Sequence, residues 1–286
     1  MTPAAQLRQL IDEGKLVTAP GAPDALTARL VEQAGFPAVY MTGFGATATR
    51  LGAPDVGLLT QTEMCAHARA MSQAVSVPII ADADTGYGGP NNIRRTVDEY
   101  VQADVAAIHL EDQVAPKRCG QRAGIELVDP HTSARRLQAA VAARGKRDLL
   151  IIGRTDGLPG VGEKEAIDRA NRYLDAGVDL VFVDGIKTVA EVEGVARHVA
   201  GPKVVSIVDG NETERLSSSD LHELGFSVVL YAVTTLFAAT HAISTALARL
   251  HDDGTPANIR PRHSYEAFSA IVDLDRYADF DETYSS

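Results

Sequence analysis

The stretch that decides the fold is residues 78–120, which begins PIIADADTGYGGP and ends AAIHLEDQVAPKRCG. Residues 78–81 form a short apolar run, and residues 106–110 form a second one. Between them, residues 91–103 carry apolar side chains at helical spacing and predict a crossover helix. Because such crossovers are right-handed and join parallel strands, both strands should end at the same edge of one sheet.

Acidic residues follow both of these strands. Asp82 and Asp84 close the first, and their spacing of two predicts that both side chains point to the same side of an extended chain. Glu111 and Asp112 close the second. Carboxylate oxygens suit Mg²⁺ or Mn²⁺ better than zinc. The sequence therefore predicts a divalent-metal site with Asp82, Asp84 and Glu111 as ligands.

Strand and helix patterns alternate along most of the chain. Eight apolar runs separated by helical patterns are typical of a (β/α)8 TIM barrel, which at 286 residues is commonly one domain. The expected strands are residues 16–19, 38–42, 78–81, 106–110, 149–153, 180–183, 204–207 and 228–231.

Polar residues end most of these strands. Four segments repeat a pattern in which a helix closes, turns and runs into an apolar strand, and three of the four strands end in Thr42, Glu111 and Asp184. Two intervening strands end in Arg154 and Ser206. All of these positions fall on the C-terminal face of a barrel, where active sites of this fold are built.

Helical segments flank the barrel pattern. Residues 2–14 predict a short amphipathic helix. Residues 236–286 predict a helical extension of the single domain 1–286, which either caps the barrel or packs on another subunit.

Composition excludes several classes of partner. The net charge is −11, from 27 basic and 38 acidic residues, which argues against nucleic acid and anionic membranes. No apolar run reaches the roughly 18 residues of a membrane span, and the N-terminus does not resemble a signal peptide. We therefore expect a cytoplasmic protein. Cys65 and Cys119 lie far apart and predict neither a disulfide framework nor a zinc site.

Three motifs carry a family resemblance. DADTGYGG (82–89), HLEDQVAPKRCG (109–120) and GRTD (153–156) make the chain similar to the isocitrate lyase and phosphoenolpyruvate mutase superfamily. The most similar branch contains methylisocitrate lyases, dimethylmalate lyases and carboxyphosphonoenolpyruvate mutases. The resemblance implies a (β/α)8 barrel, a need for Mg²⁺ or Mn²⁺, and a homotetramer, a dimer of dimers, that exchanges C-terminal helices.

The resemblance also implies a role for each matching residue. Asp82 and Asp84 would bind the metal, and Glu111 would hold metal-bound water. The residues implied in substrate binding are Thr42, Gly43, Phe44, Gly120, Arg154, Asp184 and Ser206. The residues implied in catalysis are Cys119, Arg154 and Glu111, with Cys119 as the acid/base.

The reaction implied is carbon–carbon bond cleavage of a 2-hydroxy or 2-oxo di- or tricarboxylate through an enolate. The metal would stabilise the enolate charge, and Cys119 would handle the proton at carbon. Lys117 and Arg118 precede Cys119 and are expected to lower the pKa of its thiol. Alternative functions are oxaloacetate hydrolysis, a carboxyphosphonoenolpyruvate mutase-like reaction, and metabolite binding without catalysis.

Four positions depart from the family pattern, namely Gln121, Asp184, Ser206 and Phe237. They correspond to residues that contact the distal part of the substrate, so we expect a dicarboxylate, such as a substituted malate, rather than a tricarboxylate. His109 lies within a strand, and we expect it to be a packed core residue that points away from the neighbours of Glu111.

Overall fold

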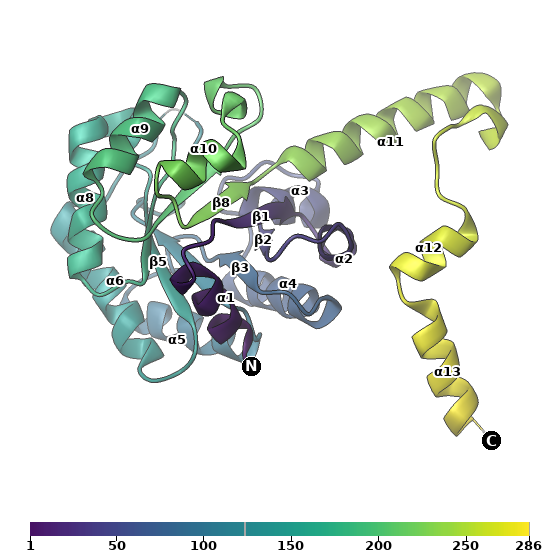
Figure 1. Ribbon diagram of the computed structural model, residues 1–286, viewed down its shortest axis with the longest axis horizontal. Coiled ribbons are helices and arrows are strands. Elements are labelled where there is room, and N and C mark those ends of the chain that lie inside the picture. Colours follow the sequence, from purple (N-terminus) through teal and green to yellow (C-terminus); the bar gives the residue numbers. More distant parts are fainter. Residues whose placement is uncertain (123, 286) are drawn as a thin grey trace.

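The computed structural model describes residues 1–122 and 124–285. Its eight strands pair in parallel and in chain order, and β1 pairs with β8, so the sheet closes into the expected barrel (Figure 1). The strands are β1 (Val17–Ala22), β2 (Val39–Met41), β3 (Ile79–Asp82), β4 (Ala107–Glu111), β5 (Leu150–Thr155), β6 (Leu180–Val183), β7 (Lys203–Ile207) and β8 (Val228–Tyr231).

Helices surround the barrel, and the longest one leaves it. The α-helices are α1 (Pro3–Asp12), α2 (Ala25–Gln33), α3 (Gly43–Leu51), α4 (Gln61–Ala74), α5 (Pro90–Gln102), α6 (Pro130–Arg144), α7 (Leu158–Val161), α8 (Glu163–Asp175), α9 (Val189–His198), α10 (Ser218–Glu223), α11 (Thr234–Asp253), α12 (Tyr265–Ile271) and α13 (Leu274–Tyr284). Two short 3₁₀ turns are η1 (Glu212–Arg215) and η2 (Pro256–Asn258).

The strands of the central stretch run further than the apolar pattern indicated. β4 includes Glu111 and β5 includes Arg154, because these two residues are partners in the parallel ladder. β3 likewise includes Asp82, which pairs with His109 of β4. The polar residues at this rim are therefore held by strand hydrogen bonds as well as by loops.

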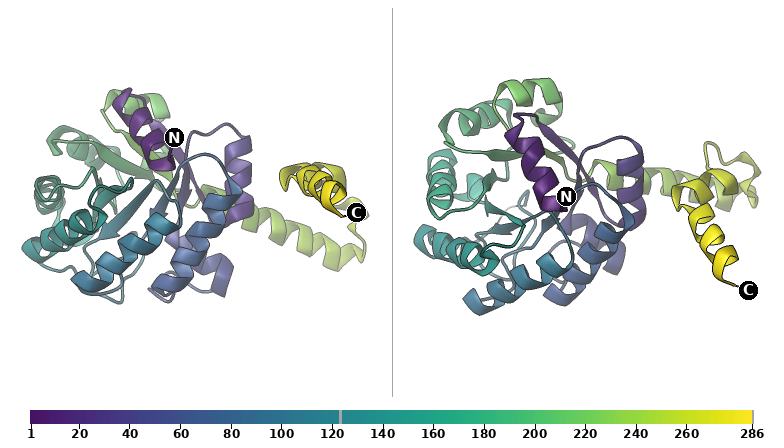
Figure 2. Two further views of the ribbon diagram at one scale, coloured as in Figure 1. Left: turned by 90° about the horizontal axis from the view of Figure 1, so that it is seen from below. Right: turned by 60° about the horizontal axis from the view of Figure 1, so that its bottom comes forward.

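The inside of the barrel is closed at its N-terminal end by α1 (Figure 2). Ala4 and Leu7 of α1 belong to the same buried apolar cluster as interior side chains such as Val17 and Leu150. Arg8 of α1 also donates to Asp179, just before β6. The barrel interior at this end is therefore filled with apolar side chains.

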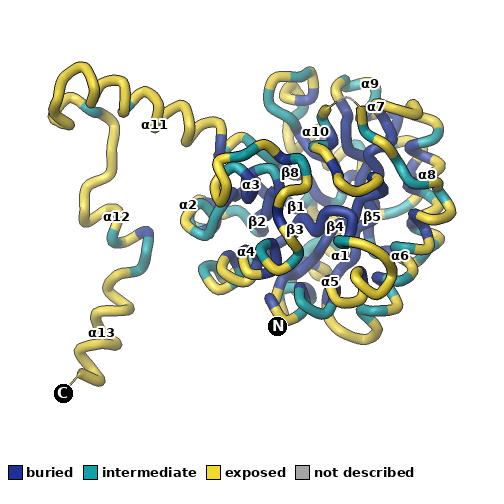
Figure 3. The backbone as a smooth tube through the Cα atoms, turned by 180° about the vertical axis from the view of Figure 1, so that it is seen from behind, coloured by how far each residue is buried: buried dark blue, intermediate teal, exposed yellow. Residues whose placement is uncertain are grey.

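The segment from α11 to α13 extends away from the barrel (Figure 1), and most of it is exposed (Figure 3). Gln33 Nε2 of α2 donates to the carbonyl oxygen of Ile271 in α12 at 3.4 Å. The division into one barrel domain and an extension from residue 236 remains a prediction. Among the described residues, no helix is long and apolar enough to cross a membrane, and the cytoplasmic location remains a prediction.

Candidate active site

A tight turn after β3, rather than an extended chain, places the first two acidic residues. Asp84 has φ 46°, and its backbone N–H donates to Asp82 Oδ1 at 2.9 Å. The expectation of an extended chain from Asp82 to Asp84 was therefore wrong. The strand ladder ends at Asp82, and the chain turns back through Gly86, whose N–H bonds to Ala83 O at 3.0 Å. The backbone of Glu111 donates to Asp84 O at 3.0 Å and fixes this turn to β4.

Lys117 lies among the carboxylates and not beside the cysteine thiol. Its Nζ atom is 2.8 Å from Asp55 Oδ1 and 2.9 Å from Asp84 Oδ1, and all three side chains are buried. Asp55, on the segment after α3, had no signal in the sequence, since it follows neither a strand nor a recognisable motif. The contact joins this segment to the loop that carries Cys119.

Arg154 is surrounded by three carboxyl groups at the end of β5. Its Nε atom lies 2.8 Å from Asp156 Oδ1 and 3.5 Å from Glu111 Oε2, and its Nη2 atom lies 2.7 Å from Asp184 Oδ2. The guanidinium also stacks over the ring of Phe182, with Cζ 5.3 Å from the centroid. The planar fork of an arginine is suited to this arrangement, because it donates in fixed directions to several oxygens at once.

Glu111 is buried without a hydrogen-bond donor. Both of its side-chain oxygens lie out of solvent and lack a hydrogen-bond partner among the described residues, and only the ion pair with Arg154 Nε at 3.5 Å reaches Oε2. Burial raises the pKa of Glu111 well above its usual range, although the charge of Arg154 opposes this. Buried carboxyl oxygens are normally satisfied by hydrogen bonds or bound ions. Glu111 therefore fits a role in holding a metal through water.

Negative charge exceeds positive charge in this cluster. The carboxyl groups joined by these contacts number six against two cations, Lys117 and Arg154, and all are buried. The acids are Asp55, Asp82, Asp84, Glu111, Asp156 and Asp184. A divalent cation would offset part of this excess. Within the described part of the chain, however, no three His, Cys, Asp or Glu side chains are grouped closely enough to hold a metal ion. The metal set Asp82, Asp84 and Glu111 thus remains a prediction.

A cavity of about 200 Å³ opens at the C-terminal end of the barrel, and most of the predicted site residues line it. The predicted residues in its wall are Thr42, Phe44, Asp82, Cys119, Gly120, Arg154, Asp184 and Ser206. Gly43, Asp84 and Glu111 lie just behind this wall, where each contacts one of its residues. A Cβ on Gly43, for example, would stand 2.4 Å from Asp82 Oδ2. The departures Gln121 and Phe237 line the cavity as well.

Thr42 and Phe44 reach the cavity at the start of α3. The structure makes Thr42 the N-cap of that helix, and its Oγ1 accepts a hydrogen bond from Gly45 N at 3.3 Å. Gly43 and Phe44 are thus the first helical residues, where backbone N–H groups have no partner within the helix. Such a helix start favours a carboxylate.

Cys119 sits on a loop that packs against the Arg154 cluster. Its backbone N–H donates to Asp55 O at 3.3 Å. Next to it, a Cβ on Gly120 would stand 2.5 Å from Asp184 Oδ2 and 2.6 Å from Arg154 Nη2, so only glycine fits. Burial raises the pKa of the Cys119 thiol to about 11. The expectation that neighbouring cations lower this pKa was wrong, because the Lys117 ammonium pairs with carboxylates.

His109 is buried, as expected, but it faces the inside of the barrel on the same side as Glu111. Residues 109 and 111 are two apart on β4 and therefore share a face, so the expected alternation was wrong. His109 Nε2 lies 3.0 Å from Tyr40 Oη, and burial lowers the pKa of the imidazole to about 4. The ring is neutral, and its Nδ1 atom lies 3.7 Å from Asp82 Oδ1.

Several lining residues were missed from the sequence. Tyr40 and Phe182 lie two residues before Thr42 and Asp184, so the alternation of a strand would have identified both. Val208 and Val233 follow β7 and β8 and carry no polar signal. Phe44 and Phe237 add two aromatic rings to the apolar part of the wall.

The closed barrel and the cavity lined by strand-end residues at its C-terminal face are typical of an enzyme of the (β/α)8 class. More particularly, residues 7–251 match the phosphoenolpyruvate phosphomutase family, and the chain belongs to that family, within the phosphoenolpyruvate mutase/isocitrate lyase superfamily. The resemblance seen in the sequence is confirmed.

Relatives with several activities are similar over the whole chain. A 2,3-dimethylmalate lyase of Eubacterium barkeri is 39% identical, with 100% of this chain and 99% of the relative covered. A chloroplastic carboxyvinyl-carboxyphosphonate phosphorylmutase of Arabidopsis thaliana is 36% identical, with 98% and 84% covered.

Solved structures of the superfamily are also similar. An oxaloacetate acetylhydrolase with 3,3-difluorooxalacetate has a TM-score of 0.94 at 31% identity, covering 100% of this chain and 98% of the other. A 2,3-dimethylmalate lyase has a TM-score of 0.93 at 37% identity, covering 99% and 95%. A phosphonopyruvate hydrolase with oxalate and Mg²⁺ has a TM-score of 0.91 at 31% identity, covering 100% of both chains.

Proposed function

We propose that this protein is a Mg²⁺- or Mn²⁺-dependent lyase that cleaves the C2–C3 bond of a small 2-hydroxydicarboxylate bearing an apolar substituent, such as a dialkylmalate. The activity of the relative from Eubacterium barkeri and the Mg²⁺ bound in the phosphonopyruvate hydrolase structure support it. The observation that carries the proposal is the buried cluster of six carboxyl groups and two cations at the cavity.

The excess of acids in this cluster would repel a dianionic substrate. A divalent cation would offset part of that repulsion and would supply Lewis-acid stabilisation of the enolate charge. Asp82 and Asp84 would hold it, and Glu111, whose oxygens lack donors, would accept hydrogen bonds from its water. Burial removes the screening by solvent, so the repulsion between these carboxylates is stronger than in a surface cluster. A bound cation would therefore stabilise them more.

Arg154 and the start of α3 would bind the substrate carboxylates. Arg154 is held in place by Asp156 on one side of its fork, and a substrate carboxylate would replace Asp184 on Nη2. Burial raises the pKa of Asp184, so this carboxyl is more easily neutralised than an exposed one. The backbone N–H groups at Gly43 and Phe44 would hold the second carboxylate.

The apolar side chains of the cavity wall would accept the substituent at C3. Among them, Phe44 and Phe237 meet edge to face with ring centroids 6.3 Å apart at 80°. An arginine in place of Phe237 would suit a third carboxylate, whereas two phenyl rings suit methyl groups. The cavity volume of about 200 Å³ fits a small substituted malate.

Cys119 would deliver the proton that completes the reaction. Asp184, whose pKa is raised by burial, would take the proton of the substrate hydroxyl. As C2–C3 breaks, the electron pair moves to C3 and its carboxylate while C2 becomes a 2-oxo acid. A protonated thiol at the cavity wall can then protonate C3. The raised pKa of Cys119 keeps the thiol protonated at neutral pH, as a general acid requires.

The activity is tested by proton NMR on purified protein with Mg²⁺ and a panel of dimethylmalate, citramalate, methylisocitrate, oxaloacetate and phosphonopyruvate. We expect dimethylmalate to give a 2-oxo acid and a monocarboxylic acid. Excess chelator should reduce turnover to below about a hundredth, and added Mg²⁺ or Mn²⁺ should restore it. Asp82→Asn, which keeps the shape of the side chain, should be inactive at the same metal concentration.

Other outcomes of the panel separate the alternatives. Oxalate and acetate from oxaloacetate would make the protein a hydrolase instead. Cleavage that continues unchanged in chelator would contradict metal dependence. Binding of Mg²⁺ and a dicarboxylate in calorimetry, without turnover of any compound, would leave a metabolite-binding barrel.

We also propose that the protein assembles as a homotetramer through the segment from α11 to α13. That segment exposes large apolar side chains, including Ile243 (58% exposed), Leu247 (59%), Phe280 (68%) and Tyr277 (64%). Apolar surface on this scale marks an interaction site. Helix exchange between subunits would bury it.

Light scattering after size exclusion tests this assembly. The expected mass is four times the 30.4 kDa of the chain. Leu247→Lys should shift the protein to a smaller species, because a buried charge opposes the contact. Val161→Lys, at an exposed apolar residue of α7, is the matched control and should leave the mass unchanged. A compact monomer in the wild type would contradict the proposal.

A further inference from the structure

Gln113 is a buried side chain that neither the metal cluster nor the substrate cavity uses. It lies two residues after the end of β4 and is 1% exposed. Its backbone pairs in an isolated antiparallel bridge with Leu127. On either side, Val114 N donates to Glu126 O at 2.8 Å and Val128 N donates to Asp112 O at 2.9 Å. The residue is therefore fixed to the barrel by its main chain.

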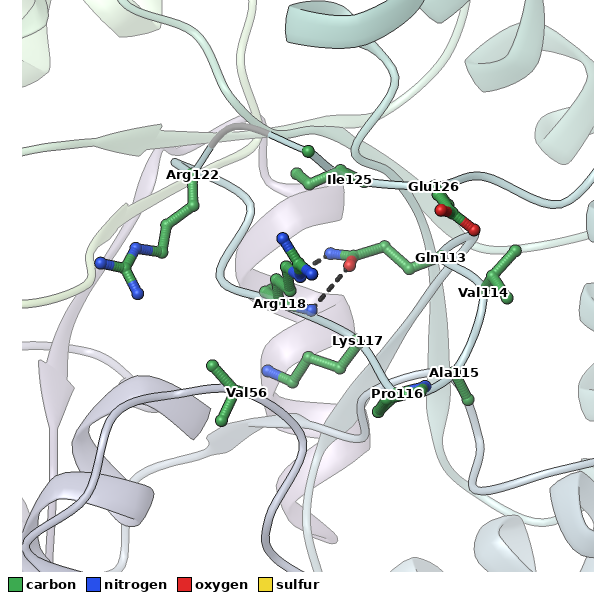
Figure 4. A pocket seen from close by; sticks show the side chains of 11 residues that line it. Val56, Gln113, Val114, Ala115, Pro116, Lys117, Arg118, Arg122, Ile125 and Glu126 are labelled. Atoms are coloured by element: carbon green, nitrogen blue, oxygen red, sulfur yellow. Dashed lines mark hydrogen bonds between the residues drawn. The ribbon is translucent and has the colours of Figure 1, made fainter.

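The amide of Gln113 holds the loop that carries the cysteine. Its Oε1 accepts a hydrogen bond from Arg118 N at 2.8 Å, and its Nε2 donates to Arg118 O at 2.7 Å. Figure 4 shows the amide facing the main chain of Arg118, with both bonds drawn. Arg118 immediately precedes Cys119, so the two bonds set the direction in which the chain enters the thiol-bearing residue.

The same amide reaches the arginine cluster. Gln113 Nε2 also donates to Asp156 Oδ2, while Asp156 Oδ1 accepts from Arg154 Nε at 2.8 Å. A primary amide has two N–H donors and one oxygen acceptor, and here all three functions are used. No carboxylate or apolar side chain of similar size can make this set of bonds.

The far side of Asp156 is anchored in the barrel wall. Its backbone N–H donates to Asp112 Oδ1 at 3.0 Å. Asp112 Oδ2 in turn accepts from Thr155 Oγ1 and Tyr173 Oη, each at 2.7 Å, and from Arg169 Nη1 at 3.1 Å. These bonds restrict the movement of Asp156. The Gln113 amide therefore holds the loop at a fixed position relative to the barrel wall.

We infer that Gln113 is a positioning residue, which fixes the backbone before Cys119 relative to the guanidinium of Arg154. The inference rests on the proposed function, in which Cys119 protonates carbon while Arg154 holds the carboxylate. A proton donor and an anchor on separate elements must be held at a set separation, since a misplacement of about 1 Å can cost about a hundredfold in rate. The Gln113 amide provides that separation.

Two variants and one control test the inference. Gln113→Leu removes all three hydrogen bonds at similar volume. Gln113→Glu keeps the acceptor for Arg118 N but loses both donors and faces Asp156 with a second carboxylate. Gln138→Leu makes the same change at an exposed position on α6. Thermal melting confirms that each variant is folded.

We expect both Gln113 variants to lower kcat by about 10- to 100-fold, with KM changed less than threefold, because Arg154 and the metal ligands stay in place. A loop that has lost its hydrogen bonds to Gln113 should also expose the Cys119 thiol. The rate at which iodoacetamide labels Cys119, followed by peptide mass spectrometry to separate it from buried Cys65, should rise at least tenfold. The control should match the wild type in every measurement.

The labelling rate needs no substrate, so it separates this inference from the proposed function. If the wild type turns over no compound of the panel, faster labelling in both Gln113 variants would still support the role of Gln113 in holding the loop. Labelling within twofold of the wild type in both variants would overturn it. Faster labelling with unchanged kcat in an active enzyme would overturn the positioning role.

Discussion

Replacing Arg154 by lysine is expected to lower kcat/KM by at least about a hundredfold. The guanidinium donates along fixed directions to Asp156 and to the position that a substrate carboxylate would take, and an ammonium cannot make both contacts at once. Lysine keeps the charge, so the loss would report geometry. Steady-state kinetics with the substrate found by NMR measures it, and we expect most of the loss in KM.

Lysine is preferred to alanine at this position for a structural reason. Removal of the buried cation would leave Asp156 and Asp184 facing each other unpaired, at a cost of about 3–5 kcal/mol in the free energy of unfolding. The matched control is Arg144→Lys, because Arg144 donates to Leu149 O at 3.2 Å at the opposite end of the barrel. Equal losses in both variants would show that Arg154 acts only through stability.

The barrel could be predicted because the strands are apolar runs and most of them are followed by a polar residue. In a parallel barrel both faces of a strand are buried, so these runs are nearly continuous and easily recognised. β6 and β8 have the bounds expected for them. β5 is longer than expected, since hydrogen bonding to β4 continues through Arg154, and apolarity gives no sign of such pairing.

The candidate site could be predicted where strand position determines it, and Cys119 and Gly120 of the loop were found only through the family motif. Asp184 and Arg154 sit at strand ends and line the cavity as expected. The pairing of Lys117 with Asp55 joins two loops, and such long-range contacts between charged residues leave no periodic signal. Gln113 was overlooked because its partners, the main chain of Arg118 and the carboxylate of Asp156, are brought to it only by the fold. The pKa of Cys119 was misjudged because residues adjacent in sequence were assumed to be adjacent in space.

Replacing Cys119 by serine is expected to lower kcat by about 10²- to 10⁴-fold and to leave KM nearly unchanged. A serine hydroxyl fits the space of the thiol but is a far weaker acid, so the protonation of C3 would be slower. Cys65→Ser, at a buried cysteine remote from the cavity, is the matched control. It should cost about 1–3 kcal/mol of stability, from a buried hydroxyl, without changing kcat.

The pH dependence of the wild type gives an independent check on the same residue. A general acid is active while it is protonated, so a pKa raised from the usual value of about 8.5 extends activity to higher pH. Because burial raises the pKa of Cys119 to about 11, kcat should stay level through pH 9 and fall only as the pH approaches that value. A fall in kcat near pH 8.5 would show that Cys119 has the pKa of an ordinary exposed thiol. Unchanged turnover in Cys119→Ser would exclude Cys119 as the proton donor.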